Sequence, residues 1–284
     1  MLIIICGRNY IYDIIILGDS MKELVVSIRN YNNYNYKEII NNIKKVGFQN
    51  VFIEWYNNDL SLQENILNYT KEVGLNIVFA HLGYQNVSAL WLDTKDGDYE
   101  EKRYIDDLKK CKENGINLVV MHPTLEYENY GMNEIGLTRI KRIIDYAKEL
   151  DMKVAFENVE LVKYLEYIIK NINSSNLGVC FDVGHCHLFN NGEFNIKLFD
   201  NKVYTIHLHD NFKEKDEHNL PFDGTVNWDR AIKQIITMHY DGYIVIESGY
   251  NNYYTNFDLE GYYRLAYDRG MQLKKLFELY KNNK

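Results

Sequence analysis

Short apolar runs alternate with longer amphipathic segments along most of this 284-residue chain, and this alternation restricts the fold more than any other feature. Each run is too short for a helix and is rich in Val, Ile and Phe, which is typical of strands buried on both faces. The predicted strands are Leu24–Ile28, Val51–Trp55, Asn76–Ala80, Asn117–Met121, Lys153–Phe156, Leu177–Phe181, Val203–Leu208 and Tyr243–Ile246.

The segments between these runs carry apolar residues at helical spacing, and several end at a glycine that can cap a helix. These glycines are Gly47, Gly74, Gly115 and Gly242. The predicted helices are Tyr36–Val46, Leu62–Val73, Tyr99–Asn114, Glu134–Leu150, Leu161–Asn171, Trp228–His239 and Leu259–Tyr280. Eight strands alternating with helices over about 260 residues match the size of one (β/α)₈ barrel. An open doubly wound sheet is the alternative, but no GxGxxG or Walker sequence follows the first strand.

The composition is globular, with 46% hydrophobic and 25% charged residues. No repeat or linker divides the chain, so residues 21–284 are expected to form a single barrel domain. Met21 has the character of a natural start, and residues 1–20 are expected to be an N-terminal extension. The apolar runs Leu2–Cys6 and Ile14–Leu17 are far shorter than a membrane span, so no membrane association is expected.

The net charge of −8 argues against a nucleic-acid partner, because such binding depends on basic residues that neutralise phosphates. The four cysteines form no CxxC pair and are expected to be reduced thiols of a cytoplasmic protein. A homo-oligomer is left open by the sequence.

Residues able to bind a metal or move a proton follow the predicted strands. Because the C-terminal ends of barrel strands meet at one mouth, these side chains are expected to converge. They are His81, His122, Glu157, Asp182, His185, His207 and Glu247. A carboxylate beside a buried strand requires a cation or several donors, and this applies to Glu157, Asp182 and Glu247.

Two Glu, one Asp and one His form a mixed ligand set that suits Mn²⁺, Mg²⁺, Co²⁺ or Zn²⁺. Further along, Asp216 and His218 are two residues apart in a loop, so both can turn toward the same site. The remaining histidines are expected to be structural, and only one of His207 and His209 is expected to face the mouth. This structural set is His187, His209 and His239.

The chain resembles the xylose-isomerase-like barrels, which include sugar isomerases and epimerases and the endonuclease-IV-type apurinic/apyrimidinic endonucleases (AP endonuclease family 2). The motifs are Phe156-Glu157-Asn158, Cys180 to His185, Ile206 to Asn211, Asp216-Glu217-His218 and Val245-Ile246-Glu247. In the epimerase branch, the resemblance implies one metal held by the residues Glu157, Asp182, His207 and Glu247. It further implies that the two glutamates exchange protons and that His185 contacts the substrate.

In the endonuclease branch, the resemblance implies three zinc ions held by nine residues. The matching positions are His81, His122, Glu157, Asp182, His185, His207, Asp216, His218 and Glu247. One departure is Phe222-Asp223-Gly224, which stands where the family often has Gly-x-Gly.

The leading hypothesis is a divalent-metal-dependent sugar or sugar-phosphate isomerase or epimerase, with a small carbohydrate as substrate. Glu157 and Glu247 would transfer protons through a metal-stabilised enediolate, and His185 would hydrogen-bond a substrate oxygen. The alternative is a zinc-dependent endonuclease-IV-like phosphodiesterase, in which His81, His122, His185, Asp216 and His218 would bind additional metal. A non-catalytic sugar- or metal-binding barrel is the third hypothesis.

Overall fold

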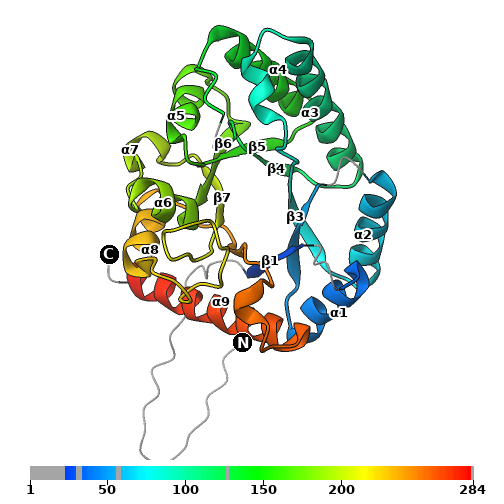
Figure 1. Ribbon diagram of the computed structural model, residues 1–284, viewed down its shortest axis with the longest axis vertical. Helices are drawn as coiled ribbons and strands as arrows, with labels where there is room; N and C mark the ends of the chain where they lie inside the picture. The colour runs from blue at the N-terminus through cyan, green and yellow to red at the C-terminus, as the bar shows by residue number, and fades with distance from the viewer. Residues whose placement is uncertain (1–22, 30–33, 56–58, 126–127, 283–284) are drawn as a thin grey trace, which may run out of the picture.

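In the computed structural model, eight parallel strands are surrounded by helices (Figure 1). The structure describes residues 23–29, 34–55, 59–125 and 128–282. The expected N-terminal extension, residues 1–20, lies outside the described residues. The strands are β1 (Leu24–Ile28), β2 (Asn50–Glu54), β3 (Asn76–His81), β4 (Leu118–Met121), β5 (Lys153–Glu157), β6 (Leu177–Asp182), β7 (Val203–His207) and β8 (Ile244–Ile246). Each lies within two residues of its predicted position.

The strands follow the order β7-β6-β5-β4-β3-β2-β1-β8, so neighbours in sequence pair from β1 through to β7, and β8 pairs with β1. The gap between β7 and β8 is bridged by two backbone hydrogen bonds, from Leu208 N to Val245 O at 2.9 Å and from Glu247 N to Leu208 O at 3.2 Å. This nearly closed sheet confirms the predicted (β/α)₈ barrel.

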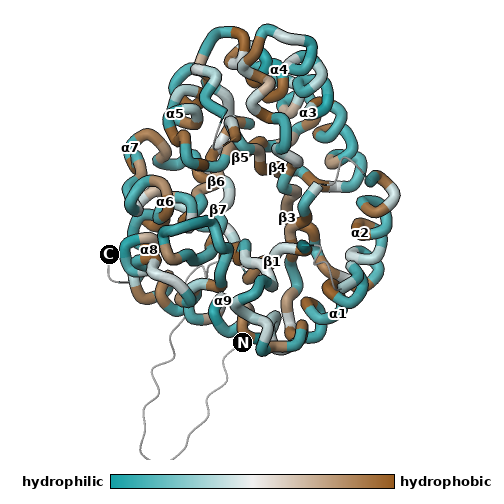
Figure 2. The backbone as a smooth tube through the Cα atoms, viewed as in Figure 1, coloured by the Kyte–Doolittle hydropathy of each residue, from teal (hydrophilic) through white to brown (hydrophobic). Residues whose placement is uncertain are grey.

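Helices cover the outside of the sheet, and hydrophobic residues occur along both the strands and the helices (Figures 1 and 2). Buried hydrophobic residues of strands and helices form one core cluster. The longer ones are α1 (Tyr36–Val46), α2 (Leu60–Glu72), α3 (Lys95–Glu113), α4 (Glu134–Glu149), α5 (Val162–Asn171), α8 (Trp228–Thr237) and α9 (Leu259–Asn282). Shorter elements not predicted from the sequence are α6 (Val183–Asn190), α7 (Ile196–Phe199) and the 3₁₀ turns η1 (Val87–Trp91) and η2 (Asn252–Tyr254).

The glycines predicted to end helices behave in two ways. Gly47, Gly74 and Gly115 have φ values of 113°, 72° and 80°, in the left-handed region that favours glycine. Gly242 does not cap α8, whose C-cap is Met238. It is instead required by close packing, because a Cβ there would lie 2.4 Å from the hydroxyl of Tyr240. Within the described part of the chain, no helix is long and apolar enough to cross a membrane.

Candidate metal centre

Four side chains at consecutive strand ends form the centre of the barrel mouth, and we call them the strand group. Glu157, Asp182 and His207 are the last residues of β5, β6 and β7, and Glu247 directly follows β8. All four are at most 3% exposed. One ligand atom from each lies within 4.8 Å of those from the other three. The four side chains predicted to hold a metal are therefore brought together.

His207 is the centre of the strand group. Its Nδ1 lies 3.0 Å from Glu247 Oε2, 3.1 Å from Glu157 Oε1 and 3.8 Å from Asp182 Oδ2. Asp182 Oδ2 is buried and has no hydrogen-bond partner among the described residues. Buried carboxylate oxygens of this kind carry a high desolvation cost unless a cation compensates it. The donor set therefore fits a divalent cation.

Charge coupling within the strand group is strong. Burial raises the pKa of Glu157 and Glu247, but nearby imidazoles outweigh this effect and hold both values well below the usual range. His207 is the largest of these influences at both carboxylates, with His122 and His185 adding to it at Glu157. Burial lowers the pKa of His207, whereas Cys180, Glu247 and Glu157 raise it well above its ordinary value. The carboxylates thus favour positive charge at their common point.

Three further imidazoles lie close to the carboxylate of Glu157. Its Oε2 lies 3.0 Å from His81 Nε2 and 3.3 Å from His122 Nε2, and its Oε1 lies 3.3 Å from His185 Nδ1. His81, His122 and Glu157 can together offer ligand atoms to one ion. The carboxylate of Glu157 therefore joins two candidate metal positions.

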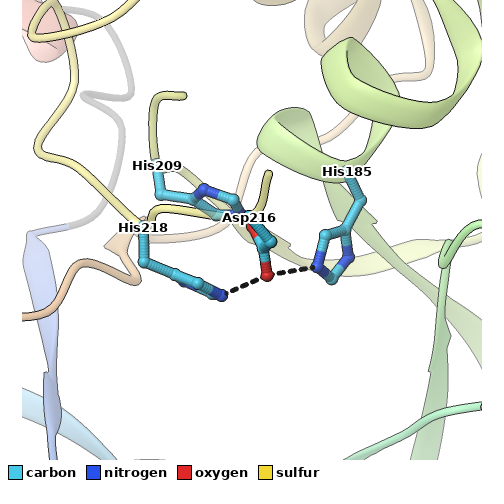
Figure 3. Close-up of side chains that lie close together, drawn as sticks. All are labelled: His185, His209, Asp216 and His218. Carbon is cyan, nitrogen blue, oxygen red and sulfur yellow. Dashed lines mark hydrogen bonds and ion pairs between the residues drawn. The ribbon is translucent and has the colours of Figure 1, made fainter. Parts of the chain in front are cut away.

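A second cluster lies beside the strand group, and we call it the loop group: His185, His209, Asp216 and His218 (Figure 3). The Asp216 carboxylate lies between the imidazoles, with Oδ2 2.8 Å from His218 Nε2 and 3.3 Å from His185 Nε2. Burial raises the pKa of Asp216, but His218 and His209 outweigh it and hold this pKa far below the usual range. The cluster fits a cation as well.

Backbone carbonyls orient three of these histidines. Nδ1 of His81 lies 3.1 Å from Leu82 O, that of His185 3.0 Å from Asn158 O, and that of His218 2.9 Å from Glu247 O. With Nδ1–H donating to a carbonyl, the Nε2 lone pair points at a carboxylate, where a proton or a metal ion must intervene. This arrangement is typical of metal-ligating histidines.

Helix α6 explains why the side chains of Asp182 and His185 lie close together. Asp182 is its N-cap, and Asp182 Oδ1 accepts a hydrogen bond from His185 N at 2.6 Å. Asn158 holds the strand end, because its Nδ2 donates to Asp182 O and its Oδ1 accepts from Asp182 N, both at 2.8 Å. This positioning role of Asn158 was not inferred from the sequence, although its motif was visible.

The expectation for His209 is wrong. His209 Nε2 lies 3.1 Å from Asp182 Oδ1 while His207 contacts the same carboxylate, so both histidines face the mouth. Residues two apart on an extended chain share a face, so the expectation of opposite faces was inconsistent with the period of a strand. Gly184 makes room for the His209 ring, since a Cβ there would lie 2.0 Å from it.

The other two histidines expected to be structural lie outside both groups. His187 contacts Thr225 Oγ1, and His239 pairs with Asp200 at 2.6 Å.

A cavity of about 490 Å³ opens above the strand group. Glu157 and Glu247 of the strand group line it, as do three members of the loop group. The lining residues are Arg29, Glu54, Trp55, His81, Leu82, Gly83, Tyr84, Gln85, His122, Leu125, Glu128, Glu157, His185, Asp216, His218 and Glu247. Its size suits a small ligand.

Comparison with known proteins identifies the family to which this barrel belongs. The xylose isomerase-like TIM barrel family matches residues 40–269. A solved D-psicose 3-epimerase with D-tagatose from Clostridium cellulolyticum H10 is 14% identical, covers 90% of this chain and 99% of its own, and has a TM-score of 0.71. The IOLI protein with a bound zinc atom is 16% identical, with a TM-score of 0.73 over 90% of this chain and 99% of its own. At these identities the likeness shows the fold.

A curated relative is the uncharacterized protein y4fM of Sinorhizobium fredii, which is 33% identical over 122 residues. The matched segment is 39% of this chain and 39% of that protein, so it covers well under half the length of either.

Proposed function

Because the chain belongs to the xylose isomerase-like TIM barrel family, we propose that it is a divalent-metal-dependent isomerase or epimerase of a small sugar. The likeness to a D-psicose 3-epimerase supports this reaction class. The observation that carries the proposal is that Glu157 and Glu247, from β5 and from the end of β8, line one cavity and contact the same imidazole.

The strand group would hold the metal, through carboxylate oxygens of Glu157, Asp182 and Glu247 and through Nδ1 of His207. When bound, a divalent cation supplies electrophilic stabilisation of negative charge that develops on neighbouring substrate oxygens.

The two glutamates would move the proton. An ionised carboxylate takes a proton from the carbon next to the substrate carbonyl, and a second carboxyl group returns one. Glu157 and Glu247 belong to strands that are not adjacent in the sheet, so they can approach a ligand in the cavity from different sides. His185 lines the same cavity, and as an imidazolium, with both ring nitrogens protonated, it would donate a hydrogen bond from Nε2 to a substrate oxygen.

A direct test is solvent exchange. The metal-loaded protein is incubated in D₂O with a panel of ketoses, and NMR records the C–H positions next to the carbonyl. We expect deuterium at one such position together with formation of an isomer or epimer. Absence of exchange for every ketose in the presence of Mn²⁺, Co²⁺, Mg²⁺ and Zn²⁺ would contradict the proposal.

The second candidate is a zinc-cluster phosphodiesterase, and the carbonyl-oriented histidines favour it. The strand group, the loop group and the set of His81, His122 and Glu157 offer places for more than one ion. A metal cluster can stabilise both the attacking and the leaving oxygen when a phosphodiester bond is cleaved. Cleavage of abasic-site DNA at catalytic rates by the zinc-loaded protein would establish this candidate in place of the first.

A further inference from the structure

The loop between β7 and α8 contains a carboxylate in the region where barrels of this type commonly hold a phosphate. Asp210 is fully buried and accepts four hydrogen bonds. The donors are Asn211 N, Phe222 N, Val226 N and Trp228 Nε1, at 2.9, 3.1, 2.9 and 2.9 Å. Gly224 permits this arrangement, because a Cβ there would lie 2.3 Å from Asp210 Oδ1. The chain's own anion therefore occupies these donors.

Helix N-termini around the mouth are also satisfied by side chains. The caps of α1, α2, α3, α4, α6, α8 and η2 accept backbone N–H groups and are Asn35, Asp59, Thr94, Asn133, Asp182, Asn227 and Asn251. Asp258 does the same at the start of α9, accepting from Gly261 N at 2.8 Å. Helix α5 and the 3₁₀ turn η1 have no side-chain cap. The acidic Glu160 stands just before α5, and at η1 the N–H groups of Val87 and Ala89 donate to backbone carbonyls, both at 3.0 Å. An incoming phosphate would have to displace these groups.

The cavity itself has an excess of negative charge. Five carboxylates line it, and Arg29 is the one Lys or Arg among its described lining residues. Arg29 is held by two of those carboxylates, with Nε 2.6 Å from Glu54 Oε1 and Nη2 3.1 Å from Glu247 Oε1. One divalent cation in the strand group adds two positive charges and leaves the cavity negative.

The loops that follow the strands are also poor in Lys and Arg. Between strand ends and the next helices they contain three basic residues, Arg29, Lys213 and Lys215. Lys213 Nζ donates to Asn191 Oδ1 at 2.6 Å beside a different pocket, and Lys215 is exposed. Recognition of a phosphate group generally uses Arg or Lys side chains or open backbone N–H groups.

From these observations we propose that the cavity binds an uncharged, polyhydroxylated ligand, an unphosphorylated ketose or polyol, and discriminates against phosphate esters. The inference rests on the proposed one-metal function and specifies its substrate class. Imidazoles and carboxylates of the lining hydrogen-bond hydroxyl groups, which both donate and accept. The rings of Trp55 and Tyr84 supply apolar wall, and Tyr84 is stacked on His122 at a centroid distance of 4.2 Å.

The test is a binding comparison on the full-length, metal-loaded protein. Calorimetry measures the dissociation constants of free ketopentoses and ketohexoses, of their terminal phosphate esters and of inorganic phosphate. We expect at least one free sugar to bind saturably and its phosphate ester to bind at least about tenfold more weakly, because like charges repel in a desolvated site. Tighter binding of the esters, or no binding of any free sugar, would overturn the inference.

A charge-relief variant sharpens the test. Glu54→Gln removes one of the carboxylates that hold Arg29, so the preference for the free sugar should shrink several-fold. Glu149→Gln makes the same change at an exposed site in the last turn of α4, at the other end of the barrel, and should leave the preference unchanged. An unchanged preference in Glu54→Gln contradicts the role assigned to cavity charge.

The outcome is separable from that of the proposed reaction. If solvent exchange fails while the free sugar still binds better than its ester, the reaction is wrong and the ligand class stands. If exchange occurs on phosphate esters in preference to free sugars, the reaction stands and the ligand class is wrong.

Discussion

The strand group and the loop group use the same side-chain types, but the fold positions them differently. The strand group is placed by the regular ends of β5, β6, β7 and β8 and is at most 3% exposed. The loop group starts in the first turn of α6 and takes Asp216 and His218 from an irregular loop. His218 has a φ of 50°, in the left-handed region that non-glycine residues seldom adopt.

This difference indicates separate roles. A site fixed by four strands of the barrel is rigid, whereas a loop site can vary without disturbing the fold. We therefore propose that the strand group binds the cation and that the loop group contacts the substrate and supports the metal ligands. The zinc-cluster alternative requires instead that the two groups bind metal equally.

The largest effect is expected for Asp182→Asn. The amide keeps the hydrogen bond to His185 N but removes a metal-binding charge. We expect loss of the bound ion and a fall in turnover of about 10³-fold or more, because a metal ion contributes several kcal/mol to such reactions. Metal analysis and kinetics check this. Asp200→Asn breaks an ion pair with His239 away from the mouth and serves as the matched control. Full metal content in Asp182→Asn would break the assignment.

Glu157→Gln and Glu247→Gln come next. Removal of a general acid or base typically costs about 10²- to 10⁴-fold, so each variant should lose deuterium exchange to that extent. The exchange rate is measured at saturating metal, with metal content determined in parallel, so that loss of proton transfer is separated from loss of the cation. Exchange at the wild-type rate in either variant rules out its assigned proton-transfer role.

His185→Ala tests the loop group directly. Loss of one donor to a developing negative charge typically costs on the order of 10²-fold in turnover, and metal content should stay near that of wild type. His187→Ala, in the same short helix but outside both groups, should change little. If His185→Ala loses a stoichiometric ion, the histidine is a metal ligand and the two groups act as one cluster.

The smallest effect is expected for His209→Asn. His209 contacts Asp182 and does not line the cavity, so we expect it to orient Asp182 as a metal ligand without touching the substrate. Loss of such support typically weakens metal binding by about 10- to 100-fold, with turnover restored at high metal concentration. Competition with a chelator measures the affinity. An unchanged affinity would leave His209 as packing only.

The sequence predicted the barrel and the strand group because both follow from a repeated local pattern. Alternation of apolar runs with amphipathic segments marks the strands, and the topology then brings Glu157, Asp182, His207 and Glu247 together without any knowledge of loops. Helix α6 was missed because it is short and because Asp182, the last residue of β6, is also its N-cap, so no loop residues separate the two elements.

The loop contacts could not be predicted in the same way. The carbonyl orientation of His218 and the burial of Asp210 depend on left-handed residues such as Lys213 and Phe222, which have φ values of 70° and 75°. The hydrophobic period of a sequence does not specify such backbone conformations. At Phe222 this chain also departs from the family, which often has Gly-x-Gly where this chain has Phe222-Asp223-Gly224. The role of His209 was available from the two-residue period of an extended strand, and its face was assigned wrongly.

The most direct test of the central claim is anomalous diffraction from crystals of the protein loaded with one equivalent of Mn²⁺, Co²⁺ or Zn²⁺ in turn. We predict one ion between Glu157, Asp182, His207 and Glu247, filled before any other position. An ion that fills the loop group first, or equal occupancy of the strand group, the loop group and the position beside His81 and His122, would contradict it.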